Sequence, residues 1–152
     1  MNIRISNKAI IIRGGKVLLT LNKNNNEEFY CLPGGGQDHG ETVHQSLVRE
    51  CIEETGVNIK IGELLYIRDY IAKNHEFTAT DSGAHQVEMM FLCKVINDEN
   101  LGKISVPDNW QTGVRWIEIE NLSKIKIYPD ALKQLIPKIG KEKQSIYLGD
   151  VN

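Results

Sequence analysis

The segment between residues 42 and 56 carries signals that begin and end an α-helix, and it constrains the fold more than any other part of the chain. Thr42 is a favourable N-cap, and Gln45 three residues later completes a capping box. Gly56 stands where a residue in the left-handed conformation ends many helices. We therefore predict a helix over residues 43–55. At about 100° per residue, one broad apolar arc should face a sheet, formed by Val43, Leu47, Val48, Cys51 and Ile52.

Three glutamates share another face of this predicted helix, because Glu50, Glu53 and Glu54 stand at positions i, i+3 and i+4. Like charges at that spacing repel, and the dipole of the last helical turn disfavours each anion there by roughly 0.3–1 kcal/mol. Glu54 also projects between Val43 and Leu47, so we expect it to be partly buried. A solvated acidic face would explain Glu50 and Glu53. Glu54 at the core edge favours a bound hard cation such as Mg²⁺ or Mn²⁺.

The residues before this helix predict short strands. Apolar residues 9–12 and 17–21 flank a glycine-containing turn, which is typical of a β-hairpin. The polar residues 22–28 should form an exposed loop, and residues 29–32 should form a short strand that Pro33 ends.

Glycines dominate residues 34–40, which we expect to form a flexible loop. Its backbone N–H groups suit phosphate binding, although plain loop glycines are an equal alternative. Beyond the helix, residues 57–69 and 86–95 are strand-rich, with residues 73–84 an irregular loop between them.

The last third of the chain predicts one more strand at residues 114–117 and a second helix. That helix should begin at residues 128–131 and run to about Ile136, where Pro137 ends it. Strands, a helix, more strands and another helix indicate a mixed sheet covered by helices, an α/β or α+β sandwich. We expect a single domain over residues 1–152.

The formal net charge of −2 gives no general attraction to nucleic acid or to an anionic membrane. We therefore expect a small-molecule partner that is held by a few cations or a bound metal; a homodimer is left open. Three cysteines, at positions 31, 51 and 93, lack C-x-x-C spacing and are expected to be buried thiols, which suits the cytoplasm. No apolar run approaches the ~20 residues that span a bilayer.

The strongest functional signal is the spacing of certain residues between positions 35 and 57. These residues are Gly35, Glu41, Arg49, Glu50, Glu53, Glu54, Gly56 and Val57. The arrangement resembles the Nudix box, G-x5-E-x7-R-E-U-x-E-E-x-G-U, in which U is a bulky apolar residue. Every fixed position matches, and Cys51 stands where Leu, Ile or Val is usual. The flanks are also similar to the family, at residues 32–35 before the box and 116–122 after it.

This resemblance implies an α/β/α sandwich around a mixed sheet, and hydrolysis of a nucleoside diphosphate linked to another group. By position, the ligands of the Mg²⁺ or Mn²⁺ ion would be Glu50, Glu53, Glu54 and the backbone of Gly35. Arg49 would orient a carboxylate instead of contacting the substrate, although a plain surface ion pair with Glu53 is its simpler interpretation. Glu41 would brace the loop against the helix.

A carboxylate must also accept the proton of the attacking water. Glu50 and Glu53 are the nearest candidates. Some family members use a carboxylate on a loop before the last sheet strand, where this chain has Asp108. The alternative for Asp108 is a turn-forming residue after Pro107.

Residues that would recognise the rest of a substrate are less distinct. Stacking on a base is open to Phe29, Tyr30, Tyr70 and Trp110, each of which also suits the core or its rim. Three residues of one predicted strand should look into the site, namely His85, Gln86 and Glu88. The neighbouring Met89, Met90 and Phe91 suit the core.

The substrate itself is predicted only by default. The signature tied to ADP-ribose has a proline where this chain has Ala72, and the tyrosine linked to dinucleoside polyphosphates is missing from residues 73–75. The default is a nucleoside triphosphate or a small nucleotide derivative. One alternative is a nucleotide-binding sensor without catalysis, against which the complete box argues. Another is an isoprenyl diphosphate isomerase that uses Cys31, a chemistry that does not need a complete box.

Overall fold

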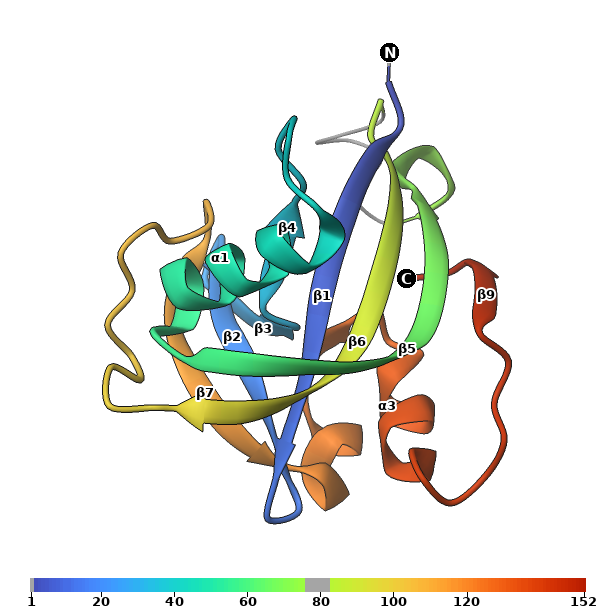
Figure 1. The fold of residues 1–152 in the computed structure, drawn as a ribbon. Coiled ribbons are helices and arrows are strands. Elements are labelled where there is room, and N and C mark those ends of the chain that lie inside the picture. Colours follow the sequence, from blue (N-terminus) through green and yellow to red (C-terminus); the bar gives the residue numbers. More distant parts are fainter. Residues whose placement is uncertain (1, 76–82) are drawn as a thin grey trace.

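The computed structural model describes residues 2–75 and 83–152. Within them the chain forms a mixed, strongly curled sheet with few helices, an α+β fold (Figure 1). The elements are β1 (Arg4–Arg13), β2 (Lys16–Asn24), β3 (Glu27–Cys31), β4 (Gly34–Gly36), α1 (Val43–Thr55), β5 (Asn58–Ile71), η1 (Ala72–Asn74), β6 (His85–Asn97), β7 (Gln111–Glu118), η2 (Ile119–Lys124), β8 (Ile127–Tyr128), α3 (Leu132–Leu135), η3 (Ile136–Lys138) and β9 (Tyr147–Asp150).

The sheet consists of two halves that meet at the β1–β2 hairpin. The strand order is β8-β3-β2-β1-β6-β5-β9, with β4 joined to β1 and β7 joined to β2. β1 and β2 pair only beside their turn, at Ile12↔Val17 and Arg13↔Lys16. Further from the turn, β1 pairs in parallel with β6, and β2 pairs with β3 and β7. The two halves therefore diverge from the hairpin, as Figure 1 shows.

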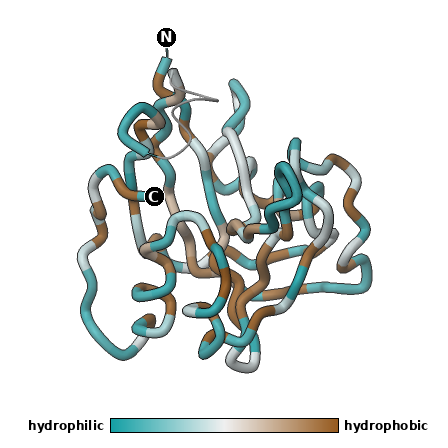
Figure 2. The backbone as a smooth tube through the Cα atoms, turned by 180° about the vertical axis from the view of Figure 1, so that it is seen from behind, coloured by the Kyte–Doolittle hydropathy of each residue, from teal (hydrophilic) through white to brown (hydrophobic). Residues whose placement is uncertain are grey.

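Strand alternation divides the hydrophobic core into two clusters on opposite faces of β1. One cluster packs beneath α1 and includes Ala9, Ile11, Leu18, Leu47, Cys51, Phe91 and Cys93. The other lies between the halves and against α3 and η3, and it includes Ile10, Leu19, Tyr66, Met90, Leu132 and Ile136. Figure 2 shows the hydrophobic parts of the chain gathered along the strands, with hydrophilic parts mostly in the loops.

The predicted helix is confirmed at both ends. The Thr42 side chain accepts a hydrogen bond from the Gln45 N–H, and the Gln45 side chain accepts one from the Thr42 N–H. Gly56 adopts a left-handed φ of 74°. A Cβ there would lie 1.9 Å from the Asn100 carbonyl oxygen, so the position requires glycine for two reasons. The expected sheet-facing role of Ile52 is wrong, because this residue lies at the edge of the arc and is 43% exposed.

Two predicted loops are largely strands. Residues 22–28 extend β2 and β3 and turn only at Asn25 and Asn26, whose positive φ values of 49° and 65° suit a two-residue hairpin turn. The first glycines of the expected flexible loop form β4, which pairs with β1. A Cβ at Gly34 would lie 2.0 Å from the Asn7 carbonyl oxygen, so glycine here permits close backbone pairing. In both cases backbone hydrogen bonds form although the side chains suggest a loop.

The C-terminal third departs furthest from expectation. The second helix spans only Leu132–Leu135, and Pro137 lies inside the following η3 turn instead of ending α3. Tyr128, expected to open that helix, belongs to β8. Strand β9 was not predicted. Of the expected loop over residues 73–84, the first two residues belong to η1, and residues 76–82 lie outside the described part of the chain.

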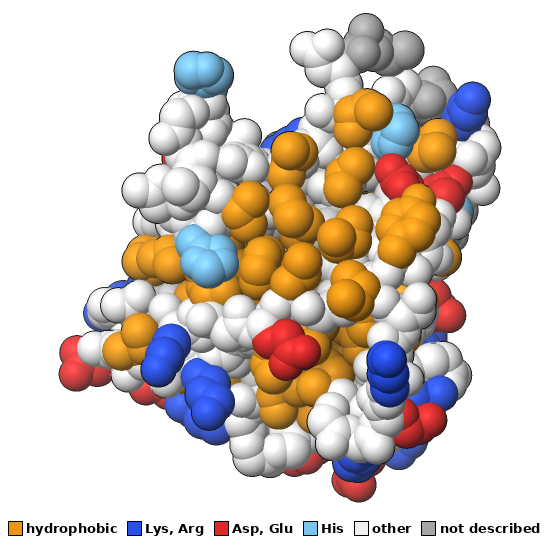
Figure 3. Space-filling view, turned by 45° about the vertical axis from the view of Figure 1, so that its right-hand side comes forward, with side chains coloured by type: hydrophobic (Ala, Val, Ile, Leu, Met, Phe, Trp, Pro, Cys, Tyr) orange, Lys and Arg blue, Asp and Glu red, His pale blue; other side chains and the backbone are white. Residues whose placement is uncertain are grey.

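Cys51 and Cys93 are buried as expected, whereas Cys31 is only partly buried. Among the described residues, no helix has the length and apolar character required to cross a membrane. α1 covers only part of its side of the sheet. Figure 3 shows hydrophobic side chains gathered on one face of the molecule. The exposed apolar residues include Ile3 just before β1, Ile5 on β1 and Tyr147 on β9.

Candidate active site

A cavity opens where the two halves of the sheet diverge, because the inner faces of β1 and β6 change character along their length. On β1 the inward side chains are polar at Ser6 and Lys8 and apolar at Ile10. On β6 they are polar at Glu88 and apolar at Met90. The parallel register places Ser6 opposite Glu88, so the polar ends of both strands coincide. The polar ends line the cavity, and the apolar ends join the core.

The cavity has a volume of about 410 Å³ and is lined by five parts of the chain. These are the start of β1, the glycines of β4, the acidic face of α1, the start of β6, and the loop before β7. The lining residues are Arg4, Ser6, Lys8, Gly35, Gly36, Arg49, Glu50, Glu53, Glu54, Gln86, Glu88, Val106, Pro107 and Asp108. The residues predicted as metal ligands therefore border one space, together with Arg49 and Asp108.

Glu54 is the most buried of the three helix glutamates, with 5% exposure, which confirms the expectation of burial. Its Oε2 accepts a hydrogen bond of 3.0 Å from the Gly34 N–H. Burial raises the pKa of the Glu54 carboxyl to about 7, against the lowering influence of Lys8 and of the Gly34 N–H. This carboxylate is therefore costly to ionise unless a cation binds beside it.

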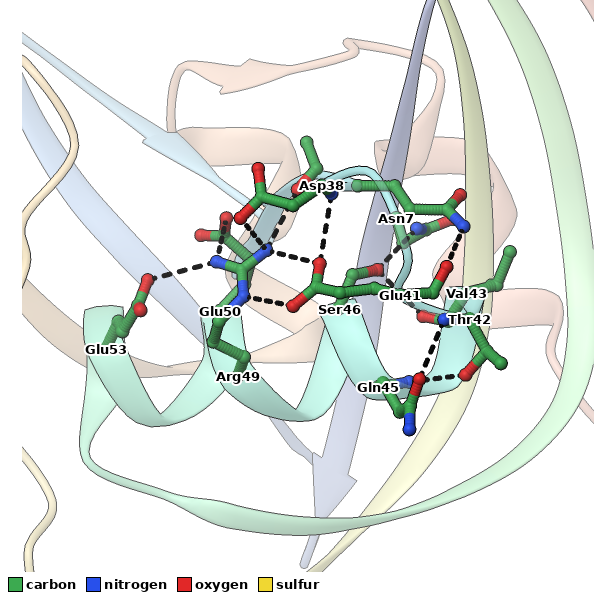
Figure 4. A network of polar contacts seen from close by, with 12 residues as sticks. Asn7, Asp38, Glu41, Thr42, Val43, Gln45, Ser46, Arg49, Glu50 and Glu53 are labelled. Atoms are coloured by element: carbon green, nitrogen blue, oxygen red, sulfur yellow. Dashed lines mark hydrogen bonds and ion pairs between the residues drawn. The ribbon is translucent and has the colours of Figure 1, made fainter.

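Arg49 holds the remaining acids of the box in one network (Figure 4). Its guanidinium donates to both oxygens of Glu41, from Nε at 2.6 Å and from Nη2 at 2.8 Å. Nη1 donates to Glu50 at 2.8 Å and to Glu53 at 3.3 Å. The hydrogen bond from Arg49 lowers the pKa of Glu41 to about 2, assisted by the Asp38 N–H. The expected pair with Glu53 is thus the longest of the three pairs with glutamates, and Arg49 Nη2 also lies 3.5 Å from Asp38 Oδ2.

The donor set suits a hard divalent cation. A Cβ at Gly35 would lie 2.7 Å from the Glu50 carboxyl carbon, so the glycine gives this carboxylate room against the backbone. Carboxylate oxygens and a backbone carbonyl are ligands that Mg²⁺ and Mn²⁺ prefer. Among the described residues, no three acidic, histidine or cysteine side chains converge on one point. Glu50 and Glu53 are instead turned toward Arg49.

Asp108 is exposed and lies on the loop opposite α1. Its Oδ1 accepts a hydrogen bond from the Asn109 N–H, and Gln111 accepts one from the Asp108 N–H, an arrangement typical of a turn. The carboxylate nevertheless borders the same cavity as the helix glutamates. Its position therefore suits both a carboxylate that accepts a proton and a turn-forming residue.

A second chamber of about 320 Å³ adjoins the first. Phe29 and Trp110 form an aromatic wall, with ring centroids 6.2 Å apart and an edge-on geometry. Asn22, Gln86 and Asn109 supply amide groups.

The remaining candidates from the sequence lie in different places. Tyr30 packs beside the core, and Tyr70 stacks on His75. His85 bonds to Asp69 at 3.1 Å instead of facing the site. Met90 and Phe91 are buried as expected, and Met89 is partly buried.

Three lining residues, the cationic Arg4 and Lys8 and the amide Asn22, were not predicted from the sequence. Polar alternation on β1 was the available signal, because residues 4, 6 and 8 share a face. This alternation was overlooked because the strand was predicted to begin at residue 9, whereas β1 begins at Arg4.

Comparison with known proteins agrees with this geometry. The NUDIX domain family matches residues 4–139. This chain belongs to the Nudix family. The chain is 31% identical to an RNA pyrophosphohydrolase of Ruthia magnifica, over 93% of this chain and 86% of that protein. It is also 31% identical to an ADP-ribose pyrophosphatase of Methanocaldococcus jannaschii, over 77% of this chain but only 63% of that protein.

Solved structures agree on the Nudix fold. A NUDIX hydrolase from Nitrosomonas europaea superposes with a TM-score of 0.73 at 22% identity, over 100% of this chain and 80% of that one. The protein is a Nudix hydrolase that acts on phosphoanhydride bonds. The two relatives are named as enzymes that cleave pyrophosphates, so they do not support the isomerase alternative at Cys31.

Proposed function

We propose that this Nudix hydrolase is a divalent-metal-dependent pyrophosphohydrolase that cleaves a nucleoside diphosphate linked to another group. One observation carries the proposal. The three helix glutamates border a polar cavity that adjoins a chamber with an aromatic wall and amide groups. The first space suits a diphosphate, and the second suits a nucleobase.

The glutamates would hold the metal, and the other residues of the box would hold the glutamates. Glu50, Glu53 and Glu54, with the backbone of Gly35, are the proposed ligands of Mg²⁺ or Mn²⁺. When bound, such an ion neutralises phosphate charge and lowers the pKa of a water molecule. Arg49 keeps Glu50 and Glu53 beside the cavity, and Glu41 keeps Arg49 in place through two hydrogen bonds.

A carboxylate at the cavity must accept the proton of the attacking water. Glu50 and Glu53 border the cavity from α1, and Asp108 borders it from the opposite loop. Within residues 2–75 and 83–152, Asp108 is exposed and forms no salt bridge, so moving its carboxylate toward a substrate breaks only the hydrogen bond from the Asn109 N–H. Substitution of each carboxylate separates these assignments.

The nucleoside would enter the second chamber. Phe29 and Trp110 offer ring surfaces, and Asn22 and Asn109 offer both donors and acceptors to a base edge. The names of the two curated relatives, an RNA pyrophosphohydrolase and an ADP-ribose pyrophosphatase, both describe cleavage of a pyrophosphate in a nucleotide-containing substrate. We propose nucleoside triphosphates or small nucleotide derivatives as the substrate class.

A nucleotide panel with Mg²⁺ or Mn²⁺ tests the proposal by product analysis. We expect a nucleoside monophosphate and a second phosphorylated product, with AMP itself untouched, because a monoester has no anhydride. Hydrolysis in ¹⁸O-labelled water followed by mass spectrometry identifies the phosphorus that is attacked. Tight nucleotide binding without turnover would indicate a sensor instead. A homodimer stays a prediction that light scattering tests.

A further inference from the structure

Lys8 stands where the two chambers meet. Four residues line both chambers, namely Lys8, Glu54, Gln86 and Asp108. Lys8 is the cationic member of this group. It also borders a small hollow of about 60 Å³ beside Cys31 and Tyr128, so Lys8 lines all three of these spaces.

The Lys8 ammonium is held in place by one hydrogen bond and retains donors for a ligand. Its Nζ donates to the Gly34 carbonyl oxygen at 3.0 Å. The two carboxylates with the largest electrostatic influence on Lys8 each accept a hydrogen bond from another group: Glu54 from the Gly34 N–H, and Glu88 from Arg68 Nε at 2.5 Å. An ammonium has three donors. Within residues 2–75 and 83–152, Gly34 is the hydrogen-bond partner found for them.

The surroundings of Lys8 stabilise its charged form. Burial by itself lowers the pKa of this ammonium, but the nearby Glu88 and Glu54 carboxylates raise it above its usual range. The other cationic residues of the cavity are less suited to bind a ligand where the two chambers meet. Arg49 is bonded to three glutamates, and Arg4 lies exposed at the rim.

We propose that Lys8 binds the phosphoryl group next to the nucleoside and so determines specificity for substrates with an anhydride at that phosphorus. A nucleotide with its base against Phe29 and Trp110, and with its diphosphate among the helix glutamates, must cross the junction between the chambers. The group at the crossing is the phosphate attached to the ribose. This inference rests on the proposed function and adds a residue outside the Nudix box to it.

Calorimetric binding of α,β-methylene-ADP in Mg²⁺, compared with adenosine, tests the role. Lys8→Met should weaken binding of the analogue about tenfold or more, the loss expected for one charged hydrogen bond. It should leave adenosine binding unchanged. Lys8→Arg should restore most of the affinity, and Lys94→Met, an exposed lysine on neighbouring β6, should behave as the parent protein. In steady-state assays, KM should rise more than kcat falls.

Two outcomes overturn the inference. Equal loss of adenosine and analogue binding in Lys8→Met would mean that Lys8 only supports the structure, and unchanged analogue binding would mean that it does not contact the phosphate. If Lys8→Met does not fold, the Lys8 Cε resonance of the wild-type protein is followed during titration with the analogue. A shift larger than that of Lys94 supports the contact, and no shift excludes it. A wild-type protein inert toward every nucleotide would instead overturn the proposed function.

Discussion

The two walls of the cavity are built in different ways. The helix wall consists of residues close in sequence, and Arg49 bonds to Glu41, Glu50 and Glu53 within one short segment. The strand wall consists of residues far apart, because Lys8 and Glu88 come from β1 and β6, and Glu88 is paired with Arg68 of β5. The helix wall is partly exposed, and the Arg68–Glu88 pair is almost fully buried.

This difference indicates that the helix wall serves chemistry and that the strand wall serves stability. The partly exposed carboxylates of Glu50 and Glu53 cost little to keep charged and are free to exchange Arg49 for a cation. The buried Arg68–Glu88 pair is stiff, and Arg68 also donates to the Val151 carbonyl, which ties the last residues of the chain to the cavity floor. Loss of helix-wall residues should therefore affect chemistry more than stability, and the reverse should hold for the strand wall.

Removal of the metal should have the largest effect. Activity on the best substrate should vanish with a chelator and return with excess Mg²⁺ or Mn²⁺, because the helix wall cannot otherwise neutralise a diphosphate. Product release is measured at fixed ionic strength. Full turnover in metal-free buffer would contradict the whole assignment of the helix wall.

Glu53→Gln should reduce kcat by about 10³-fold or more, because a ligand or base function is lost. The free energy of unfolding, measured in urea, should change little, because the side chain is partly exposed. Glu63→Gln on the outer strand β5 is the matched control and should leave both quantities unchanged. An active Glu53→Gln enzyme would remove this residue from the site.

Asp108→Asn should reduce kcat by about 10²-fold if this residue accepts the proton. Asp130→Asn, another exposed aspartate, serves as the control. Unchanged turnover in Asp108→Asn would place the proton acceptor on α1, among the carboxylates of the helix wall.

Glu88→Gln should lower the free energy of unfolding by about 3 kcal/mol, because it leaves the buried Arg68 guanidinium without its counter-charge. Catalysis should fall far less than in Glu53→Gln. Urea denaturation and kinetics of the two variants, measured side by side, give the contrast. A Glu88→Gln protein as stable as its parent would contradict the structural role of the strand wall.

The smallest expected effect concerns pH. The pKa of Glu54 is raised to about 7 in the folded protein, so the unfolded chain loses this proton first as the pH rises. Without metal, stability should therefore fall between about pH 4.5 and 7, by about 1–3 kcal/mol from this group. Glu54→Gln should remove that part of the decline and most of the Mg²⁺-induced rise in Tm. Identical Tm profiles with and without the substitution would exclude both roles.

Much of the helix wall was predictable from the sequence. Helix caps act through neighbours three or four residues away, and the periodicity of α1 placed Glu54 at the core edge. Strand boundaries were less accessible. Asn22 and Gly34 belong to strands because partner strands satisfy their backbone groups, and no local pattern reveals the partner.

By itself, the sequence determined the capped helix, its buried Glu54 and the spacing of the Nudix box, because each depends on interactions between residues close in the chain. Only the tertiary structure decided that Lys8, Arg68 and Glu88 meet behind that helix. Their meeting depends on the parallel register of β1 with β6 and on the divergence of β1 from β2 beyond the hairpin. Long-range pairing sets both, and a single strand's pattern does not encode which strand lies beside it.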